Sequence, residues 1–179
     1  MKDIKKSKIE NMGSIIAGLA AGLLFSVYIT ELLQFAIASL FATNNLHLNL
    51  TGINIYSLFY VEETLELQSI IAVYLSPYFC TIFITEIILY FLKKTEVGFS
   101  RFSMIIFLIM ITGYIIISVF YGSIITILEY HSFNDVTLFF AQLKLTPLVE
   151  IGIIFLIVFL TLGYVSSVFK RVQSYITSF

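Results

Sequence analysis

Only a few side chains in this chain could do chemistry, and they are carboxyl, amide and imidazole groups. Glu31 and Gln34 stand three residues apart in the apolar stretch YITELLQFAIASLF, residues 28–41, and Glu86 lies in SPYFCTIFITEIILYF, residues 76–91. A carboxyl group in apolar surroundings can act as a general base, take part in a proton relay or hold a metal ion. We therefore consider first what these acids could bind, and then which elements position them.

A metal site is one alternative. His47, His131 and Asp135 all fall in polar connections, and two histidines with an aspartate could bind a metal ion. The histidines lack the His-x₃-His spacing of a helical site, so we interpret both as solvated loop residues. The sequence contains no Walker loop, nucleophile elbow or dinucleotide fingerprint. We expect no cofactor and no metal.

The composition defines the surroundings of these groups. Of 179 residues, 59% are hydrophobic and 12% are charged, which is about half the charged share of a soluble domain. So few polar groups cannot cover a soluble surface, and lipid is expected to be the main solvent. The net charge of −1 excludes the basic field that nucleic acid binding requires. The single cysteine, Cys80, excludes an internal disulfide.

Four apolar segments are long enough to cross a bilayer, which takes about 20 residues. They cover residues 13–42, 69–92, 102–128 and 148–169. The apolar run after the basic N-terminus is not closed by a small-residue cleavage site, so we interpret it as an uncleaved first span. The expected fold is an all-α polytopic membrane protein with a single integral membrane domain over residues 1–179.

The basic residues orient these spans. Nine of the ten lysines and arginines fall on one side of a four-span arrangement, and only Lys144 falls on the other. By the positive-inside rule both termini are cytoplasmic, and we expect the plasma membrane of a bacterium. The connection at residues 44–68, Asp135 and both histidines then lie on the outer side.

Local signals next to the spans predict two further features. Residues 47–62 alternate in part between apolar and polar types around a Thr-Gly pair, which favours a short β-hairpin on the outer side. Thr146, Pro147 and Glu150 indicate where the fourth span begins. They supply a cap, a proline at the first helical position and an acid in the first turn.

Ser14, Gly18 and Gly22 form a small-residue face on the first span that includes a GxxxG motif. Small residues at this spacing let helix backbones approach closely in lipid. The face is a candidate for helix packing, and two interpretations are open. It could pack against another helix of the same chain, or it could dock another membrane protein.

Glu86 is the most deeply placed acid, about 10 Å of helix before Lys93. It is a candidate intramembrane polar site, because a membrane-buried carboxyl is costly unless it faces protein or water. It could stay protonated, bond to a neighbouring helix or act in a proton relay. Pro77 on the same helix is expected to free the carbonyl of Val73 and to kink the span.

Thr30-Glu31-Leu32-Leu33-Gln34 occupies the pattern of a HExxH helix, in which two histidines bind zinc and the glutamate activates water. A small and aromatic tail follows it, then the expected hairpin, then Ser76-Pro77 in the second span. Finally HSFNDVTLFFAQLKLTP, residues 131–147, precedes the last span. In this order the chain resembles the membrane-embedded site-2-type zinc metalloproteases.

The resemblance implies that Glu31 matches the catalytic glutamate and Asp135 the third, acidic ligand. Thr30 and Gln34 stand where the two histidine ligands belong, and a hydroxyl and an amide do not replace neutral imidazoles at zinc. It therefore implies a degenerate, non-catalytic relative with a vestigial site of Thr30, Glu31, Gln34 and Asp135. The family opens its site toward the cytoplasm, whereas the charge rule directs Glu31 outward.

The alternative to this resemblance is that Glu31 and Gln34 are interface residues beside a helix end. Glu31 lies about 27 Å of helix after Gly13, near the outer edge of the hydrocarbon. Water or the loop at residues 44–52 would then satisfy both side chains.

The leading functional hypothesis is a non-catalytic binding or assembly subunit of a membrane complex, with the bilayer and another membrane protein as partners. The alternative is a small-molecule transporter component or its substrate-binding subunit. Four spans rather than six count against that alternative, and the sequence shows no convergent polar cluster at mid-membrane. An active intramembrane enzyme is the least favoured hypothesis.

Overall fold

The computed structural model describes residues 2–41, 46–48, 59–61, 66–96, 98–128 and 134–177. Within this part of the chain, four helices are long and apolar enough to cross a membrane: Met12–Ile37, Leu67–Lys94, Phe99–Ile127 and Pro147–Ile176. The expected all-α polytopic membrane fold with four spans is confirmed.

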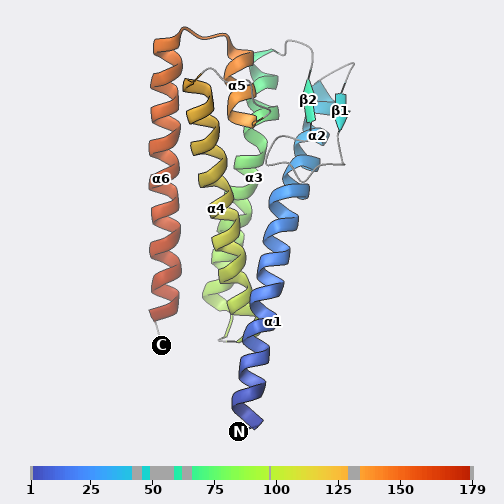
Figure 1. The fold of residues 1–179 in the computed structure, drawn as a ribbon, viewed down its shortest axis with the longest axis vertical. Coiled ribbons are helices and arrows are strands. Elements are labelled where there is room, and N and C mark those ends of the chain that lie inside the picture. Colours follow the sequence, from blue (N-terminus) through green and yellow to red (C-terminus); the bar gives the residue numbers. More distant parts are fainter. Residues whose placement is uncertain are drawn as a thin grey trace.

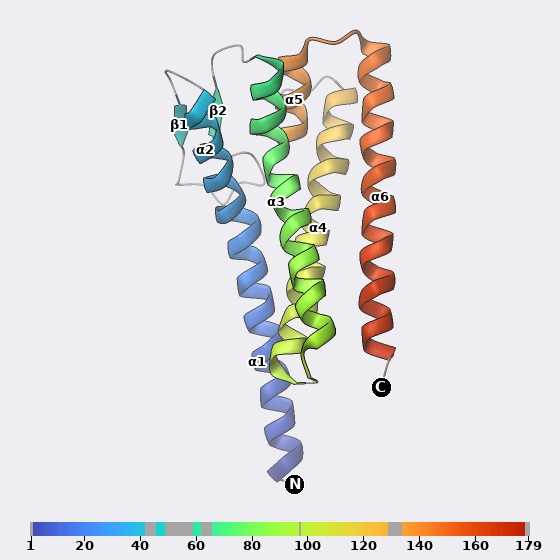
Figure 2. The same ribbon diagram turned by 180° about the vertical axis from the view of Figure 1, so that it is seen from behind.

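The four long helices stand side by side as a bundle (Figure 1). Three of them are α3 (Leu67–Lys94), α4 (Phe99–Ile127) and α6 (Pro147–Thr177). In both views α6 forms one edge of the bundle, the N-terminal helix forms the other, and α3 and α4 lie between them (Figure 2). The start of the chain, the α3–α4 connection and the end of α6 lie at one end of the bundle, so the termini share a side.

The N-terminal helix is continuous but changes its winding once. It consists of α1 (Lys2–Leu24), a π-helical turn η1 (Phe25–Ile29) and α2 (Thr30–Phe41). A π-turn inserts a residue and so rotates the side chains that follow it relative to those before it. Thr30 begins α2, and its Oγ1 donates to the Ser26 carbonyl at 2.9 Å. The turn thus immediately precedes the residues of the HExxH-like pattern.

The small-residue face of α1 packs against α4. A Cβ added at Gly18 would stand 2.7 Å from the Ser103 carbonyl oxygen, and one at Gly22 would stand 2.6 Å from the Met110 Cβ. The Ser103 hydroxyl also donates to the Ser14 carbonyl at 3.1 Å. Because the face is covered by α4, it serves packing within the chain, and its interpretation as a docking face for another protein is not supported.

Pro77 lies within α3 and removes a backbone donor there. The Ser76 hydroxyl donates to the Val73 carbonyl at 2.8 Å. The carbonyl that the proline was expected to free is therefore satisfied by the neighbouring side chain. One turn later the Thr81 hydroxyl donates to the Pro77 carbonyl at 2.7 Å.

Two short strands lie beside α2 at the end of the bundle opposite the two termini, which we call the outer end (Figure 1). β1 (Leu46–Leu48) pairs antiparallel with β2 (Phe59–Val61), with Leu46 opposite Val61. The rest of the hairpin expected over residues 47–62 lies outside the described residues.

The last span begins as the sequence predicted. Pro147 is the first residue of α6, Glu150 lies in its first turn, and the Glu150 N–H donates to the Thr146 carbonyl at 3.0 Å.

Candidate functional site

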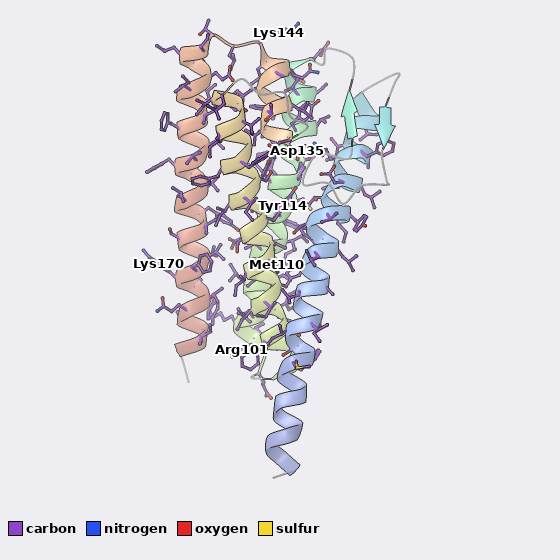
Figure 3. All side chains as sticks on the ribbon, viewed as in Figure 1. Arg101, Met110, Tyr114, Asp135, Lys144 and Lys170 are labelled. Atoms are coloured by element: carbon purple, nitrogen blue, oxygen red, sulfur yellow. The ribbon has the colours of Figure 1, made fainter. Side chains whose placement is uncertain are left out.

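A short helix, α5 (Asp135–Leu143), begins inside the bundle and ends at its outer end. Figure 3 shows Asp135 among the long helices, close to the level of Tyr114, and Lys144 at the outer end. The Asn134 amide donates to the carbonyl and the hydroxyl of Ser118, both at 3.4 Å. Ser118 precedes the last residue of α4 by nine positions, which is about 13 Å of helix. After α4 the chain therefore re-enters the bundle.

Gly122 of α4 makes this re-entry possible. A Cβ at Gly122 would collide with the Asn134 side chain and would stand 2.6 Å from the Val136 Cβ. Asn134 also caps α5, because its Oδ1 accepts from the Val136 N–H at 2.9 Å. Backbone groups at this depth must be hydrogen-bonded and covered by protein. The Asn134 cap provides a hydrogen bond to the start of α5, and the contact with Gly122 places this backbone against α4.

The residues of the predicted vestigial site come together around the start of α5. The Gln34 Nε2 donates to the Asp135 Oδ1 at 2.7 Å, a bond between residues 101 positions apart. Gln34 is 0% exposed, Asp135 3% and Glu31 6%, and Thr30 is fully buried as well. The structure thus brings together a set of residues that only the resemblance linked.

Two tyrosines and two small polar residues complete this arrangement. The Tyr114 hydroxyl lies near the side chain of Thr30, and the Tyr78 hydroxyl shares a 2.8 Å hydrogen bond with the Ser118 Oγ. Both tyrosine hydroxyls lie near the carboxyl groups of Asp135 and Glu31. We refer to the whole set as the outer polar cluster: Thr30, Glu31, Gln34, Tyr78, Tyr114, Ser118, Asn134 and Asp135.

The outer polar cluster holds one buried acceptor that has no hydrogen-bond partner in the described part of the chain. Three buried side-chain oxygens in the described part of the chain have no hydrogen-bond partner there: Ser26 Oγ, Gln34 Oε1 and Ser123 Oγ. Of these, Gln34 Oε1 belongs to the cluster. An amide oxygen accepts hydrogen bonds, so this atom could receive one from a donor group.

The donor set does not match a zinc centre of the resembled family. Thr30 and Gln34 use their side chains in bonds to Ser26 and Asp135 at the positions where imidazole ligands would be needed. Among the residues that the structure describes, no three His, Cys, Asp or Glu side chains are grouped to hold a metal. His47 lies in β1, and His131 lies outside the described residues.

Three interpretations drawn from the sequence need correction here. Asp135 was expected in an outer connection, but it is the buried first residue of α5. The alternative placed Glu31 and Gln34 at an interface, satisfied by water or by the loop at residues 44–52, but both side chains are buried and the Gln34 amide bonds to Asp135. The sequence showed no convergent polar cluster at mid-membrane, whereas polar side chains of α2, α3, α4 and α5 do converge between the helices. All three differences have the same cause, because the re-entry of α5 covers this part of the N-terminal helix.

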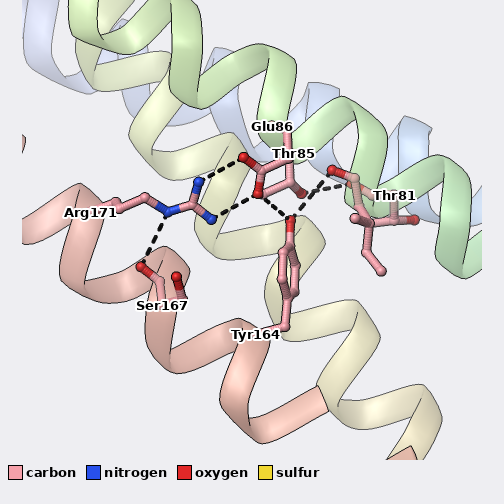
Figure 4. A network of polar contacts seen from close by, with 7 residues as sticks. Thr81, Thr85, Glu86, Tyr164, Ser167 and Arg171 are labelled. Carbon is pink, nitrogen blue, oxygen red and sulfur yellow. Dashed lines mark hydrogen bonds and ion pairs between the residues drawn. The ribbon is translucent and has the colours of Figure 1, made fainter. Parts of the chain in front are cut away.

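Glu86 lies in a second polar site, in the last third of α3 toward the α3–α4 connection, and Figure 4 shows its polar contacts. Its two carboxylate oxygens pair with the Arg171 guanidinium of α6 at 2.7 and 2.8 Å, and the Tyr164 hydroxyl donates to the Glu86 Oε1 at 3.1 Å. The Glu86 side chain is 45% exposed and that of Arg171 35%. We refer to Glu86, Tyr164 and Arg171 as the inner ion-pair site.

The geometry of the inner ion-pair site decides between the interpretations of Glu86. Bonding to a neighbouring helix was one expectation, and the pair with Arg171 fulfils it. A bidentate pair fixes both carboxylate oxygens, which supports a helix-joining role over a proton relay. The Glu86 carboxyl lies on the surface of the bundle and not in its interior. The charge of Arg171 compensates the carboxylate at this position.

Sequence reasoning did not identify Tyr78, Tyr114, Asn134 or Arg171. The first two are single tyrosines in apolar spans, and nothing local distinguishes them. Asn134 did carry a signal, since Asn-Asp before DVTLFFAQL is typical of a capped helix start. Arg171 was read only as an orienting charge.

No protein family model, no curated protein and no solved structure matches this chain.

Proposed function

We propose that this chain is a non-catalytic subunit that binds or assembles with another membrane protein in a membrane complex. We propose further that its outer polar cluster is a degenerate counterpart of a site-2-type metalloprotease site. One observation carries this proposal: the 2.7 Å hydrogen bond between the Gln34 Nε2 and the Asp135 Oδ1. The resemblance linked these two positions as zinc ligands, and they meet across 101 residues.

The side chains at the ligand positions support binding rather than catalysis. Metal-assisted hydrolysis requires ligands that hold the ion and leave an open position for water. A hydroxyl and an amide that bond to Ser26 and Asp135 are poor substitutes for two imidazoles. Glu31 retains a carboxyl group, but the ligands that would deliver an activated water to it are missing from Thr30 and Gln34.

The charge distribution supports insertion in a bacterial plasma membrane with both termini in the cytoplasm. Arg101 lies at the end of the bundle that holds the termini, and Lys144 lies at the opposite end (Figure 3). Labelling with a membrane-impermeant thiol reagent would test this orientation. In a Cys80→Ser background, Lys144→Cys should be labelled from outside intact cells and Lys93→Cys should not; the reverse pattern would contradict the orientation.

The first test of the function is a native mass spectrum of the protein released from mild detergent. We expect an added mass that matches a second protein, and a mass equal to one bare chain would contradict the assembly role. A stoichiometric zinc ion, with peptide cleavage that is lost in Glu31→Gln but kept in Glu96→Gln, would contradict the non-catalytic role. Glu96 is a suitable control because it is exposed in the α3–α4 connection.

A second candidate function is a small-molecule transporter component or its substrate-binding subunit. The re-entrant start of α5 favours it, because transporters place substrate sites where broken helices bring polar groups to mid-membrane. A small molecule that is retained through purification, and lost in Asp135→Asn, would favour this candidate over the assembly subunit.

A further inference from the structure

An apolar cavity of about 420 Å³ lies between α3, α4, α5 and α6. This volume falls within the usual range for small-ligand sites. Its walls are almost entirely hydrocarbon, and within the described part of the chain no charged residue lines it. Along α3 the lining extends from Leu75 to Ile82, which is about 10 Å of helix. The cavity therefore has room for one compact, uncharged molecule.

Three hydroxyl groups line the cavity, and two of them already have hydrogen-bond partners. The Tyr78 hydroxyl shares a 2.8 Å hydrogen bond with Ser118, and the Tyr164 hydroxyl donates to Glu86 at 3.1 Å. The third hydroxyl is that of Thr161 on α6, and it has no hydrogen-bond partner among the residues that the structure describes. The hydroxyl that remains available to a ligand is therefore that of Thr161.

Thr161 also differs from other threonines of the long helices. Thr81 and Thr112 donate to the carbonyl four residues earlier in their own helix, as threonines in helices commonly do. The Thr161 side chain borders the cavity instead. It stands 14 residues after Pro147 and 15 before Ile176, the two ends of the fourth span. An available hydroxyl thus lies near the middle of the membrane.

The rim of the cavity is open to the surroundings of the bundle. Phe79 of α3 and Leu160 of α6 both line it and are 62% and 60% exposed. In a chain whose four helices cross a membrane, side chains exposed at this level face lipid. A ligand would therefore reach the cavity from within the bilayer.

The position of Thr161 selects the polar group of the ligand. The hydrocarbon core of a bilayer offers no hydrogen-bond donors, so a carbonyl oxygen there finds a donor only on a protein. A threonine hydroxyl can donate to such an oxygen. A charged group would lack a counterion, because the described lining is uncharged and Glu86 and Arg171 pair with each other.

We infer that this cavity binds an uncharged, lipid-soluble carbonyl compound whose oxygen accepts a hydrogen bond from the Thr161 hydroxyl. The apolar body of the ligand occupies the space between α3 and α6. Such a body gains little by leaving lipid for an equally apolar cavity, so the hydrogen bond at Thr161 decides selectivity. The inference goes beyond the assembly role proposed above, because it needs only the cavity and Thr161.

Benzophenone is a suitable probe, because it is an uncharged ketone that attaches to neighbouring C–H bonds under irradiation. The purified full-length protein in mild detergent is irradiated with increasing benzophenone, and peptide mass spectrometry locates the attachment sites. Ile115 and Val119 of α4 are the informative positions, since they line the cavity and are only 4% and 3% exposed. We expect saturable attachment there. Attachment only to side chains on the outside of the bundle would overturn the inference.

Competition between three nine-carbon compounds tests the polar group: 5-nonanone, nonane and nonanoate. We expect 5-nonanone to displace benzophenone from Ile115 at a concentration about two- to tenfold lower than nonane, the effect of one neutral hydrogen bond. Nonanoate should displace it no better than nonane, because its charge finds no counterion. Equal displacement by ketone and alkane, or stronger displacement by nonanoate, would overturn the inference.

Variants locate the hydrogen bond. Thr161→Val keeps the shape of the side chain and should abolish the advantage of 5-nonanone over nonane, whereas Thr161→Ser should retain it. Thr161→Ala, which also lacks the hydroxyl, is a second test of the same bond. Thr112→Val is the matched control, because Thr112 does not line this cavity. Val119→Phe should fill the cavity and abolish attachment at Ile115. A ketone advantage that persists in Thr161→Val and Thr161→Ala would overturn the inference.

Native mass spectra and crosslinking separate this inference from the proposed function. A bare chain that prefers the ketone would contradict the assembly role and support the ligand site. A chain that retains a partner protein and does not distinguish ketone from alkane would support the assembly role and overturn the ligand site.

Discussion

At the outer polar cluster the Asp135 carboxyl is buried and accepts a hydrogen bond from the neutral amide of Gln34. At the inner ion-pair site the Glu86 carboxyl is 45% exposed and is held by the guanidinium of Arg171. Both acids belong to helices of the same bundle. The Asp135 carboxyl is buried among polar side chains, whereas the Glu86 carboxyl is partly exposed and is paired with the opposite charge of Arg171.

The difference lies in how much of the fold each site requires. The ion pair of the inner site needs only the Glu86 and Arg171 side chains on neighbouring helices, and either can move without moving the backbone. The outer polar cluster needs the whole re-entry of α5, with its cap at Asn134 and its contact at Gly122. Buried polar networks of this kind lose more than a single bond when one member is removed. We therefore expect changes at the outer cluster to affect the entire fold and changes at the inner pair to remain local.

The largest effect should follow from Gly122→Ala. The added methyl group would displace Asn134 and Val136 and so move the start of α5. Overpacking of this kind costs about 1–3 kcal/mol. Reversible unfolding in mixed detergent micelles would measure the free energy of unfolding.

Gly113→Ala on the same helix is the matched control, because a Cβ there meets no atom within 4 Å. It should be neutral, or stabilise by up to about 1 kcal/mol through helix propensity. Equal effects at the two glycines would show that α5 does not depend on its contact with α4.

A comparable or smaller effect should follow from Gln34→Leu. The variant removes the amide that donates to the Asp135 Oδ1 and leaves a buried acceptor, which costs about 1–3 kcal/mol. A double-mutant cycle with Asp135→Leu isolates the pair, because the double variant leaves neither partner unsatisfied. Additive losses in the cycle would mean that the bond does not couple α2 to α5.

The sequence could predict the features that depend on local pattern. Long apolar runs specified four spans, and Thr146, Pro147 and Glu150 specified the start of α6. The capping signal at Asn134 was also local, but its nine-residue helix is too short and too apolar to reveal its depth in the bundle. That depth depends on the absence of a side chain at Gly122, a contact between segments that no periodicity encodes.

The candidate sites show the same division. The spacing of Thr30, Glu31 and Gln34 indicated a chemical pattern, and the resemblance added Asp135, so the core of the outer polar cluster was identified. The pair of Glu86 with Arg171 could not be foreseen, since 85 residues and a helix–helix register separate them. A basic residue near a helix end indicates from sequence alone how the span is oriented in the membrane. Which acid it pairs with depends on how the helices pack.

A smaller effect is expected for Arg171→Gln. The variant removes the charge that compensates Glu86, but Glu86 can turn toward the headgroup region because its side chain is partly exposed. Interhelical polar contacts in membranes contribute about 0.6 kcal/mol on average, and we expect a loss of about 0.5–1.5 kcal/mol. Glu86→Gln in the Arg171→Gln background should restore most of it. A loss as large as that of Gln34→Leu would contradict the local character of this site.

The smallest effect concerns one hydroxyl at each site and tests the comparison most directly. Tyr164→Phe removes a 3.1 Å bond to a carboxylate that Arg171 already holds, so we expect a loss of about 0.5 kcal/mol or less. Tyr78→Phe removes a 2.8 Å bond within the outer polar cluster and should cost about 1 kcal/mol, because the Ser118 hydroxyl is buried there. Tyr28→Phe, exposed on the N-terminal helix, is the control and should change nothing. If Tyr164→Phe proved as costly as Tyr78→Phe, the inner ion-pair site would depend on a network as connected as the outer one. In that case, the burial of Asp135 and the charge pairing of Glu86 would not account for a difference in stability between the two sites.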